Sequence, residues 1–379
     1  MKIYLHLLAI ALFLFSCNVD HDQKEKSIEL IAKTKLSKID YATCFDITEE
    51  LGIKKLIIKN PFDHFSTQQT FVLLKKGEDY SAKENETVIH VPIQKIIPFS
   101  TSYLSMIDTL DELNSIASVE TRNYIYNPAI LKKIENNLIT EIGTFRDLNI
   151  EKVILQSPNL IMAVGNSGEP SKQIQKLENI GIPSLNNYDW KETHPLGKAE
   201  WIKVFGLIYD KEEEANNIFK FIEHNYKSLK SEVLSTNSNV LFSTMYNGTW
   251  YIPGGRSYIA QLVEDAKGSY PWSNDNSTGS LPLSFETVAN KQAKPSIWLN
   301  TNFNTITELI ENDSRYEKFV KSVDNKIYNN TKRTTDIGGN DYREKGALRA
   351  DLVLKDFIHL FSEATINEDS LYFFTKIKP

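Results

Sequence analysis

Aromatic side chains and one cation surround a glycine pair in the segment NGTWYIPGGRSY, residues 247–258. Such a loop could cradle a phosphate through its backbone, or close its rings and its cation over a larger ligand. A phosphate loop carries Lys-Ser or Lys-Thr after its glycines, and neither pair follows here. We therefore expect Trp250, Tyr251 and Arg256 to contact a large ligand. The alternative is that the aromatic rings pack inside the protein, against neighbouring segments.

Similar side chains occur in several other segments of the chain. Taken one at a time, packing within the protein explains each of them as well as ligand contact does. Taken together, they are aromatics with few cations, which suits stacking on a large ligand better than holding a small anion. The candidate ligand-binding residues are Tyr103, Tyr126, Trp250, Tyr251, Arg256, Tyr270, Trp272 and Arg343.

The sequence lacks the common motifs for catalysis and for metal binding. No Gly-x-Ser-x-Gly elbow and no HExxH occurs, and Cys44 has no base beside it. The histidines are dispersed without paired spacing, so we expect no metal site. Glu151 and Glu286 could form the acid and base of a surface glycosidase, but both lie where helices are predicted to begin on outer surfaces. We therefore expect a protein that is not an enzyme and that needs no cofactor.

The first residues, MKIYLHLLAIALFLFSC, carry one early lysine and an apolar run that is too short to span a membrane. Their end, residues 14–17, is similar to a bacterial lipobox, which implies cleavage before Cys17 and attachment of lipid to its sulfur. We expect a signal peptide over 1–16 and a polar tether over 17–42, with an ordinary secretory signal as the alternative. This places the protein in the cell envelope on a lipid anchor, and the periplasmic face is favoured.

Charge and composition exclude one class of partner. The formal net charge is −6 and the basic residues are scattered, so we expect no binding to nucleic acid. Acylation of Cys17 would leave Cys44 as the only thiol, so no disulfide framework holds the chain together. Stability must come from a buried core, which 379 residues with 41% hydrophobic content allow.

The elements that position the candidate residues alternate between strand and helix patterns. Strands are predicted over 54–60, 70–77 and 90–102, and the last of these delivers hydroxyl side chains to the start of a helix. In an open α/β sheet the ligand crevice lies at the carboxyl ends of the strands. After the second half begins, NVLFSTMY, PSIWLNT and NKIYNNT predict three further strands, and a last helix is predicted over 351–361.

The region between the two halves differs in kind. From about residue 197 to 234 it has no proline, and its apolar residues recur at steps of three and four. This predicts one helix of about 36 residues, about 54 Å long, which would join two lobes. The expected fold class is therefore α/β, with two Rossmann-like lobes over 43–195 and 237–379, a bridging helix over 196–236, and a ligand cleft between the lobes.

A weak internal repeat supports two equivalent lobes. Both NIEKVILQSPNLIMAV, from Asn149, and SFETVANKQAKPSIWL, from Ser284, place a glutamate just after a helix-capping residue and a proline before a strand. Glu151 and Glu286 occupy matching positions in this repeat. A glutamate in the first turn of a helix also offsets the helix dipole by about 0.3 to 1 kcal/mol, which is reason enough for its presence.

Four features together resemble the substrate-binding proteins of bacterial cobalamin and iron-siderophore import, in a lipoprotein version found in the Bacteroidetes. They are the lipobox, the segment from Asn149 to Val164, the single long helix, and NDYREKGALRADLVLKDFIHLF over 340–361. Relatives often carry Trp and Pro where this chain has Arg343 and Ala350, so Arg343 would either make the pocket more cationic than in relatives or point to solvent.

The resemblance implies a function. Such proteins bind a cobalamin-like or ferric-siderophore ligand between rigidly bridged lobes and deliver it to an inner-membrane ABC permease, whose dimer is driven by separate ATPase subunits. Docking on the permease uses one glutamate per lobe, and the matching positions here are Glu151 and Glu286. The alternatives are a divalent-metal or haem binding protein of the same fold, and a surface lipoprotein without a transport role.

Overall fold

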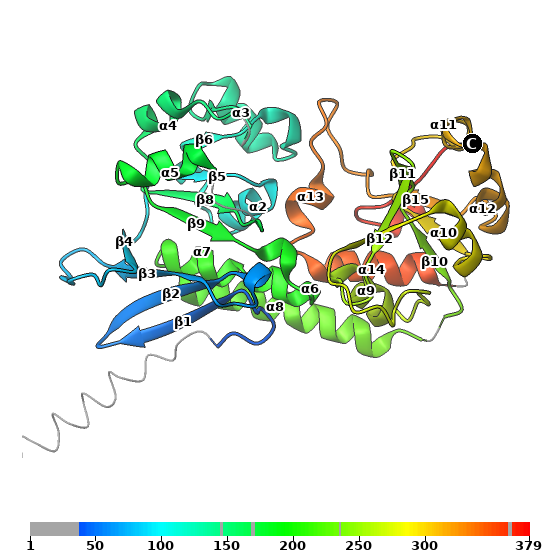
Figure 1. Ribbon diagram of the computed structural model, residues 1–379, viewed down its shortest axis with the longest axis horizontal. Helices are drawn as coiled ribbons and strands as arrows, with labels where there is room; N and C mark the ends of the chain where they lie inside the picture. Colours follow the sequence, from blue (N-terminus) through cyan, green and yellow to red (C-terminus); the bar gives the residue numbers. More distant parts are fainter. Residues whose placement is uncertain (1–37, 145–146, 168–170, 235, 363–365) are drawn as a thin grey trace, which may run out of the picture. The chain divides into compact units, whose positions relative to one another are not determined.

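The computed structural model describes residues 38–144, 147–167, 171–234, 236–362 and 366–379. The predicted signal peptide over 1–16, the predicted lipidation site Cys17, and the tether before residue 38 lie outside these ranges. Within them, no helix combines the length and the apolar character that crossing a membrane requires. The described elements form two groups around two separate sheets, one parallel and one mixed (Figure 1).

The N-terminal lobe is built on a parallel sheet of three strands, in the order β5-β8-β9. Ile97 and Ile161 from this sheet pack against Val153 of α4 and against Ile174 and Leu177 of α5. The elements of the lobe are β5 (Ile96–Pro98), α2 (Thr101–Thr109), β6 (Ser118–Val119), α3 (Pro128–Glu135), β7 (Thr140–Glu141), α4 (Ile150–Gln156), β8 (Leu160–Val164), α5 (Lys172–Asn179) and β9 (Ser184–Asn187). The predicted strand over 90–102 is in fact short, because α2 already begins at Thr101.

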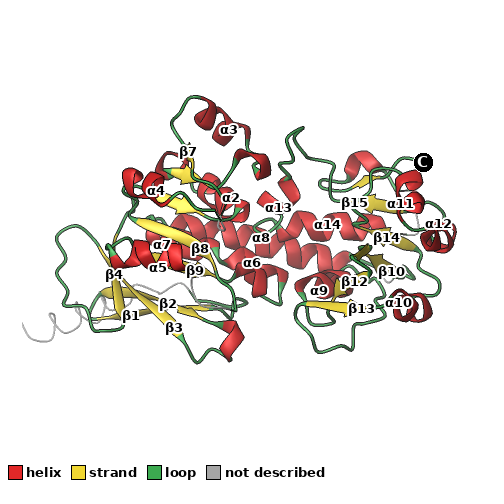
Figure 2. Ribbon diagram, turned by 45° about the horizontal axis from the view of Figure 1, so that its top comes forward, coloured by secondary structure: helices red, strands yellow, loops and turns green. Residues whose placement is uncertain are grey.

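A separate four-stranded sheet precedes this lobe (Figure 2). Its strands are β1 (Phe45–Glu50), β2 (Ile53–Lys59), β3 (Gln68–Leu74) and β4 (Glu86–His90), of which only the β3 and β4 pair is parallel. The predicted strands over 54–60 and 70–77 correspond to β2 and β3. The connection between them contains a short 3-10 helix, η1 (Pro61–Asp63), which is capped by the side chain of Asn60.

The C-terminal lobe contains a mixed sheet in the order β10-β14-β15-β16 and a small antiparallel sheet of β11, β12 and β13. The three strands predicted from NVLFSTMY, PSIWLNT and NKIYNNT are confirmed as β10, β14 and β15, and the last predicted helix is confirmed as α14. The elements are β10 (Val240–Phe242), β11 (Met245–Tyr246), β12 (Thr249–Pro253), α9 (Tyr258–Asp265), β13 (Ser280–Leu283), α10 (Phe285–Lys291), β14 (Ile297–Leu299), α11 (Ile306–Asn312), α12 (Glu317–Ser322), β15 (Ile327–Asn329), α13 (Asp341–Lys345), α14 (Ala350–Phe361) and β16 (Thr375–Lys376).

The prediction of one helix of about 36 residues is wrong. The region divides into α6 (Pro195–Glu200), α7 (Ile202–Ile208) and α8 (Glu212–Glu232). Asp210 adopts a left-handed φ of 56°, and the amide of Lys211 donates to the carbonyl of Gly206 at 2.7 Å, so α7 ends there and packs against α8. The 21-residue helix α8 also packs against α14, and therefore it is the element that bridges the two lobes (Figure 1).

Two buried glutamates hold the start of the described chain against the junction of the lobes. Glu200 accepts hydrogen bonds from the backbone amides of residues 40–42, at 2.8 to 2.9 Å, and from Lys203 at 2.7 Å. Glu192 accepts from the amides of residues 43–44, at 2.8 and 3.0 Å. We call these contacts the entry clamp. Because α6, which carries Glu200, packs against both α8 and α14, the clamp lies at the base of both lobes.

Candidate functional site

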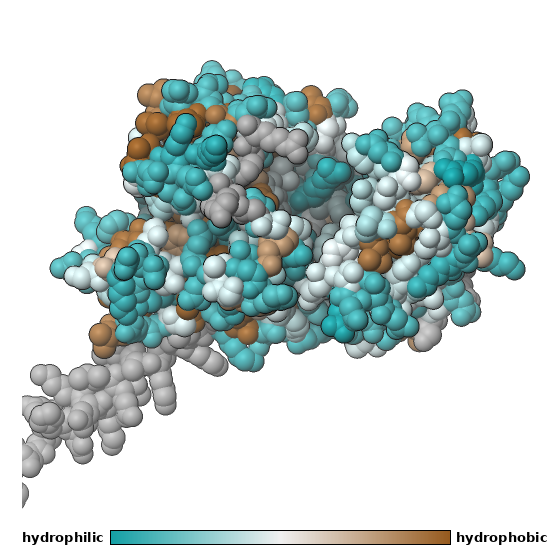
Figure 3. All heavy atoms as spheres, in the orientation of Figure 1, coloured by the Kyte–Doolittle hydropathy of each residue, from teal (hydrophilic) through white to brown (hydrophobic). Residues whose placement is uncertain are grey.

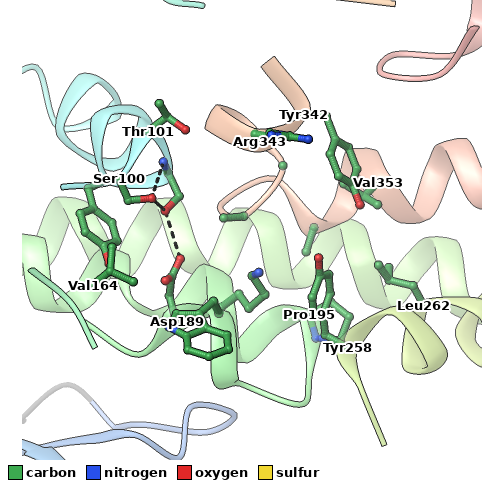
Figure 4. Close-up of a pocket in the computed structure, with 17 residues that line it drawn as sticks. Ser100, Thr101, Val164, Asp189, Pro195, Tyr258, Leu262, Tyr342, Arg343 and Val353 are labelled. Carbon is green, nitrogen blue, oxygen red and sulfur yellow. Dashed lines mark hydrogen bonds between the residues drawn. The ribbon is translucent and has the colours of Figure 1, made fainter. Parts of the chain in front are cut away.

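A cavity of about 340 Å³ lies between the two lobes. The N-terminal lobe contributes the start of α2, the carboxyl end of β8 and the 3-10 helix that follows β9. The connection α6 contributes one wall, and α9, α13, α14 and the turn between α13 and α14 contribute the rest. Figure 3 shows that the molecular face is hollowed between the lobes, and Figure 4 shows the lining side chains. The lining residues are Ser100, Thr101, Ser102, Tyr103, Val164, Asp189, Trp190, Pro195, Lys198, Tyr258, Leu262, Tyr342, Arg343, Gly346, Ala347, Ala350 and Val353.

The wall from the N-terminal lobe presents hydroxyl groups at the start of α2. The side chain of Ser100 caps this helix by accepting from the amide of Ser102 at 3.3 Å. Tyr103, in the first turn, is fully buried, and its hydroxyl has no hydrogen-bond partner among the described residues. An unmatched buried hydroxyl costs about 1 to 3 kcal/mol, so a ligand that accepts a hydrogen bond from Tyr103 would recover this energy.

A buried carboxyl group lies beside these hydroxyls. Asp189 belongs to the 3-10 helix η4 (Asp189–Lys191), which follows the carboxyl end of β9. Its carboxylate accepts a hydrogen bond from the hydroxyl of Ser102 at 3.2 Å (Figure 4). Burial raises the pKa of Asp189, while Lys198 and the Ser102 hydroxyl oppose that rise. The site therefore contains one acid whose negative charge is disfavoured.

Two cations line the same cavity. The ammonium group of Lys198 lies 4.0 Å from the ring centroid of Tyr258, and Arg343 is contributed by α13. Burial raises the pKa of Tyr342, and its charge interaction and hydrogen bond with Tyr258 add to this rise, so the phenol of Tyr342 stays protonated. Because two cations face a single acid of raised pKa, the lining favours an anionic ligand with hydrogen-bond acceptors.

The helix α13 also joins the lobes beside the cavity. The carboxylate of Glu344 accepts hydrogen bonds from the backbone amides of Tyr126 at 2.8 Å and Asn127 at 3.3 Å, at the start of α3. Burial raises the pKa of Glu344 to about 7 and Asp341 adds to the rise, while the two amide hydrogen bonds and Lys345 oppose it. We call this contact the α13 latch.

Of the predicted binding residues, Tyr103 and Arg343 line the cavity. Tyr126 lies at the α13 latch, where its ring is 5.3 Å from the guanidinium of Arg333, and it is not part of the cavity lining. The remaining five lie in the C-terminal lobe around the glycine pair, and none of them lines this cavity.

The glycine pair packs against a neighbouring loop of its own lobe. A Cβ at Gly254 would lie 2.3 Å from the carbonyl oxygen of Ser277, and one at Gly255 would lie 2.3 Å from that of Trp272. The hydroxyl of Tyr270 donates to the carbonyl of Pro253 in the same packing. The close approach that two glycines permit is therefore used between segments of the protein.

The aromatic residues of this region have different surroundings. Trp250 is fully buried, its indole N–H donates to the carbonyl of Phe242 at 2.9 Å, and its ring stacks on Trp298 at 6.1 Å. Trp272 is buried beneath the ammonium group of Lys291. Tyr251 and Arg256 are exposed outside the cavity. Trp250 therefore packs within its own lobe, which is the alternative that the sequence analysis left open.

The predicted binding residues did not include Asp189, Trp190, Lys198 or Tyr258, which also line the cavity. One feature of the sequence could have indicated Asp189 and Trp190. The segment NNYDWK directly follows a strand of a parallel sheet, and ligand crevices lie at such strand ends. Lys198 reaches the site because α6 lies beside α9, which no local pattern indicates.

The two predicted docking glutamates lie in the first turns of α4 and α10. The caps predicted for these helices are confirmed, since Asn149 accepts from the amide of Lys152 at 2.8 Å and Ser284 accepts from that of Thr287 at 3.1 Å. Both glutamates are exposed. Glu286 lies 3.6 Å from the guanidinium of Arg315.

Among the residues that the structure describes, no group of three or more His, Cys, Asp or Glu side chains is arranged to hold a metal ion. Cys44 is buried as a free thiol, and burial raises its pKa. The cavity therefore depends on hydroxyls, cations and aromatic rings for any contact with a ligand.

Comparison with known proteins gives consistent results. A family model described as periplasmic binding protein matches residues 96–332. A lipoprotein of Methanocaldococcus jannaschii is 26% identical over 328 residues, which are 82% of this chain and 77% of that protein. The petrobactin-binding protein of Bacillus subtilis is 26% identical over 206 residues, which are 52% of this chain and 62% of that protein.

A solved structure shows the same fold. A possible iron-binding (periplasmic solute-binding) protein from Staphylococcus epidermidis superposes with a TM-score of 0.57 at 18% identity, over 72% of this chain and 100% of that one. This similarity confirms the predicted α/β fold with two lobes. The four-stranded sheet β1 to β4 lies before the residues that the family model matches.

Proposed function

Because the chain belongs to the periplasmic binding protein family, a family of binding proteins and not of enzymes, we propose that it is the substrate-binding component of an ABC importer. It captures an iron-siderophore or cobalamin-like ligand between its lobes and presents this ligand to an inner-membrane permease. The observation that carries the proposal is the cavity between the lobes, where Lys198 and Arg343 face hydroxyl groups and one buried acid. The bacterial group to which the resemblance pointed stays a prediction.

Within this class, the lining favours an anionic ferric chelate. Lys198 and Arg343 supply positive charge, and the unpartnered hydroxyl of Tyr103 supplies a hydrogen-bond donor. The cavity of about 340 Å³ equals about eleven water molecules at roughly 30 Å³ each, which is small for a whole cobalamin. The similarity to a protein named for petrobactin binding supports the same choice.

Delivery involves Glu151 and Glu286, one in each lobe, which we propose to meet arginines of the permease dimer. Both are exposed at helix starts in the two lobes. Beside Glu151, the side chains of Ile154 and Leu155 are 43% and 80% exposed, and apolar surface gathers over α4 (Figure 3). Exposed apolar surface beside a charged group is typical of a protein contact. The lipid on Cys17 would hold the protein at the periplasmic face of the cell envelope.

A thermal-shift screen tests the proposed ligand class. The protein produced from Asn18 onward is heated with iron(III) catecholate, iron(III) citrate, cyanocobalamin, haemin or divalent metal ions. A ligand at 100 times its Kd adds about 2.7 kcal/mol, which is a shift of several degrees. We expect the iron(III) chelates to raise the melting temperature. If cyanocobalamin alone stabilises the protein, the ligand is cobalamin-like. If none of these compounds stabilises it, the proposed ligand class is overturned.

The same screen with a variant tests the assignment of the cavity. Arg343→Gln removes one cation and is expected to weaken the iron(III) chelates at least about tenfold, because hydrogen bonds to charged groups contribute about 1.5 to 3 kcal/mol. Lys321→Gln, an exposed charge on α12 that pairs with Glu317, is the matched control and should change nothing. Equal effects of the two variants would show that the ligand binds elsewhere.

A further inference from the structure

One aromatic side chain at the edge of the cavity is not part of any core. Trp190 lines the cavity and is 42% exposed, whereas Trp201, Trp250 and Trp298 are fully buried. Its indole N–H donates to the carbonyl of Gly165 at 3.0 Å. This bond fixes the ring at the carboxyl ends of the strands β8 and β9, and it uses the only polar atom of the side chain. The exposed part of Trp190 is therefore apolar aromatic surface.

A second ring supports Trp190 from outside the residues that the family model matches. Phe62 belongs to η1, between β2 and β3, and its ring centroid lies 5.7 Å from that of Trp190. The ammonium group of Lys191 lies 4.8 Å from the centroid of Phe62 and 5.5 Å from that of Trp190. The two rings therefore share one cation. We call these three side chains the aromatic shelf.

The backbone holds Phe62 in this place. The side chain of Asn60 accepts from the amide of Phe62 at 2.9 Å, and Pro61 between them restricts the backbone at the start of η1. Phe62 also contacts the ring of Tyr188 at 6.4 Å. The extra sheet β1 to β4 thus brings a preformed aromatic side chain to the residue that borders the cavity.

We propose that the aromatic shelf is a subsite that binds a planar aryl group of the ligand and so selects aryl-bearing ferric chelates over aliphatic ones. This inference rests on the proposed function. The cavity of about 340 Å³ encloses only part of a large chelate, so the remainder extends past its edge, where Trp190 is exposed. Offset stacking of aromatic rings contributes about 0.5 to 1.5 kcal/mol beyond area burial. Lys191 adds positive charge beside the rings, which suits the anionic oxygens of a phenolate chelate.

Two anionic iron complexes test this selectivity. Iron(III) tris-catecholate carries aryl rings and iron(III) citrate carries none. Their affinities for the mature protein are measured by titration, with Trp190→Ala, Trp190→Phe, Phe62→Ala and the control Phe65→Ala. Phe65 lies in the same connection and is 44% exposed, so it matches Phe62 in type and location.

We expect Trp190→Ala and Phe62→Ala to weaken the catecholate complex about three- to tenfold while leaving the citrate complex within about twofold. Trp190→Phe keeps a ring and should retain most of the selectivity, and Phe65→Ala should behave as the wild type. If Trp190→Ala weakens both complexes equally, the subsite is overturned, because the aromatic shelf would then only hold the cavity wall in place and would not recognise an aryl group. If the wild type binds neither complex, the proposed ferric ligand fails, and the subsite fails with it.

Discussion

At the scale of single residues, the cavity combines groups that are costly to bury unless something binds to them. The hydroxyl of Tyr103 has no partner among the described residues, and Asp189 is held beside it with a raised pKa. A hydroxyl in this position lowers the stability of the free protein and increases its affinity for an acceptor. Tyr103 is therefore a residue at which stability and binding should change in opposite directions.

Replacing Tyr103 with phenylalanine tests whether stability and ligand affinity change in opposite directions. We expect Tyr103→Phe to leave the free energy of unfolding unchanged or to raise it, because the variant removes an unmatched polar atom, and to weaken a ferric chelate about tenfold. Denaturant unfolding and ligand titration give the two numbers. Tyr209→Phe is the matched control. The hydroxyl of Tyr209 is hydrogen-bonded to that of Ser115 at 2.7 Å, so this variant should lose stability by about 1 kcal/mol and keep its affinity. A loss of stability without loss of affinity in Tyr103→Phe would contradict the assignment.

The sequence could indicate only part of this site. Tyr103 was predicted because it follows hydroxyl residues at a strand end, and Arg343 because it lies in a motif of the resemblance. Residue type does not reveal on which side of a lobe a ring lies, so Trp250 could not be distinguished from an exposed tryptophan. Lys198 and Trp190 lie in a polar stretch, NNYDWKETHPLGK, and they become part of a site only when α6 and β9 are in place.

At the scale of elements, strands and helix caps were more predictable than the connection between the lobes. Alternation and capping residues are local signals, and β10, β14, β15 and the starts of α4 and α10 follow them. The periodicity of the long region continues through Asp210 because α7 and α8 both bury an apolar face. Asp210 gives no glycine or proline signal, yet aspartate tolerates the left-handed backbone that ends α7.

The α13 latch predicts a dependence of stability on pH. In the folded protein the pKa of Glu344 is about 7, above the ordinary value of 4.5, so the folded state binds the proton more tightly than the unfolded state does. The stabilisation from this group is therefore complete below about pH 4.5, and it is lost as the pH rises to about 7. Glu344→Gln should be less sensitive to pH over this range.

The measurement is the difference in unfolding free energy between wild type and Glu344→Gln from pH 4.5 to 8. We expect the variant to gain relative to the wild type as the pH rises, by up to about 3 kcal/mol. Taking the difference cancels the other carboxyl groups, such as Glu86, whose pKa is lowered. A difference that stays constant with pH would show that Glu344 does not titrate in this range.

At the scale of the whole molecule, the surfaces proposed for capture and for delivery are separate. The cavity lies between the lobes, whereas Glu151 and Glu286 lie on α4 and α10 and line no part of it. The bridging helix α8 packs against elements of both lobes, so we expect only a small closure when a ligand binds. This separation makes it possible to impair delivery without changing affinity.

Charge reversal at both glutamates tests the separation. The double variant Glu151→Arg and Glu286→Arg should abolish ligand uptake by cells while leaving the Kd of the purified protein unchanged, because neither side chain lines the cavity. Glu213→Arg, an exposed charge in the first turn of α8, is the control and should support normal uptake. An uptake rate equal to that of the wild type in the double variant would sink the docking assignment.

The entry clamp has a mechanical consequence for the proposed attachment of the protein through its N-terminal side. Glu192 and Glu200 fasten residues 40–44 at the base of both lobes, and α6 between them also borders the cavity. A pull along the chain from its N-terminal side therefore acts beside α6, which packs against α8 and α14, and has a short lever arm on either lobe. The same pull on the tip of one lobe would exert a torque that opens the cleft. In the proposed lipid-anchored protein, a pull on the tether would therefore leave the ligand in the cavity.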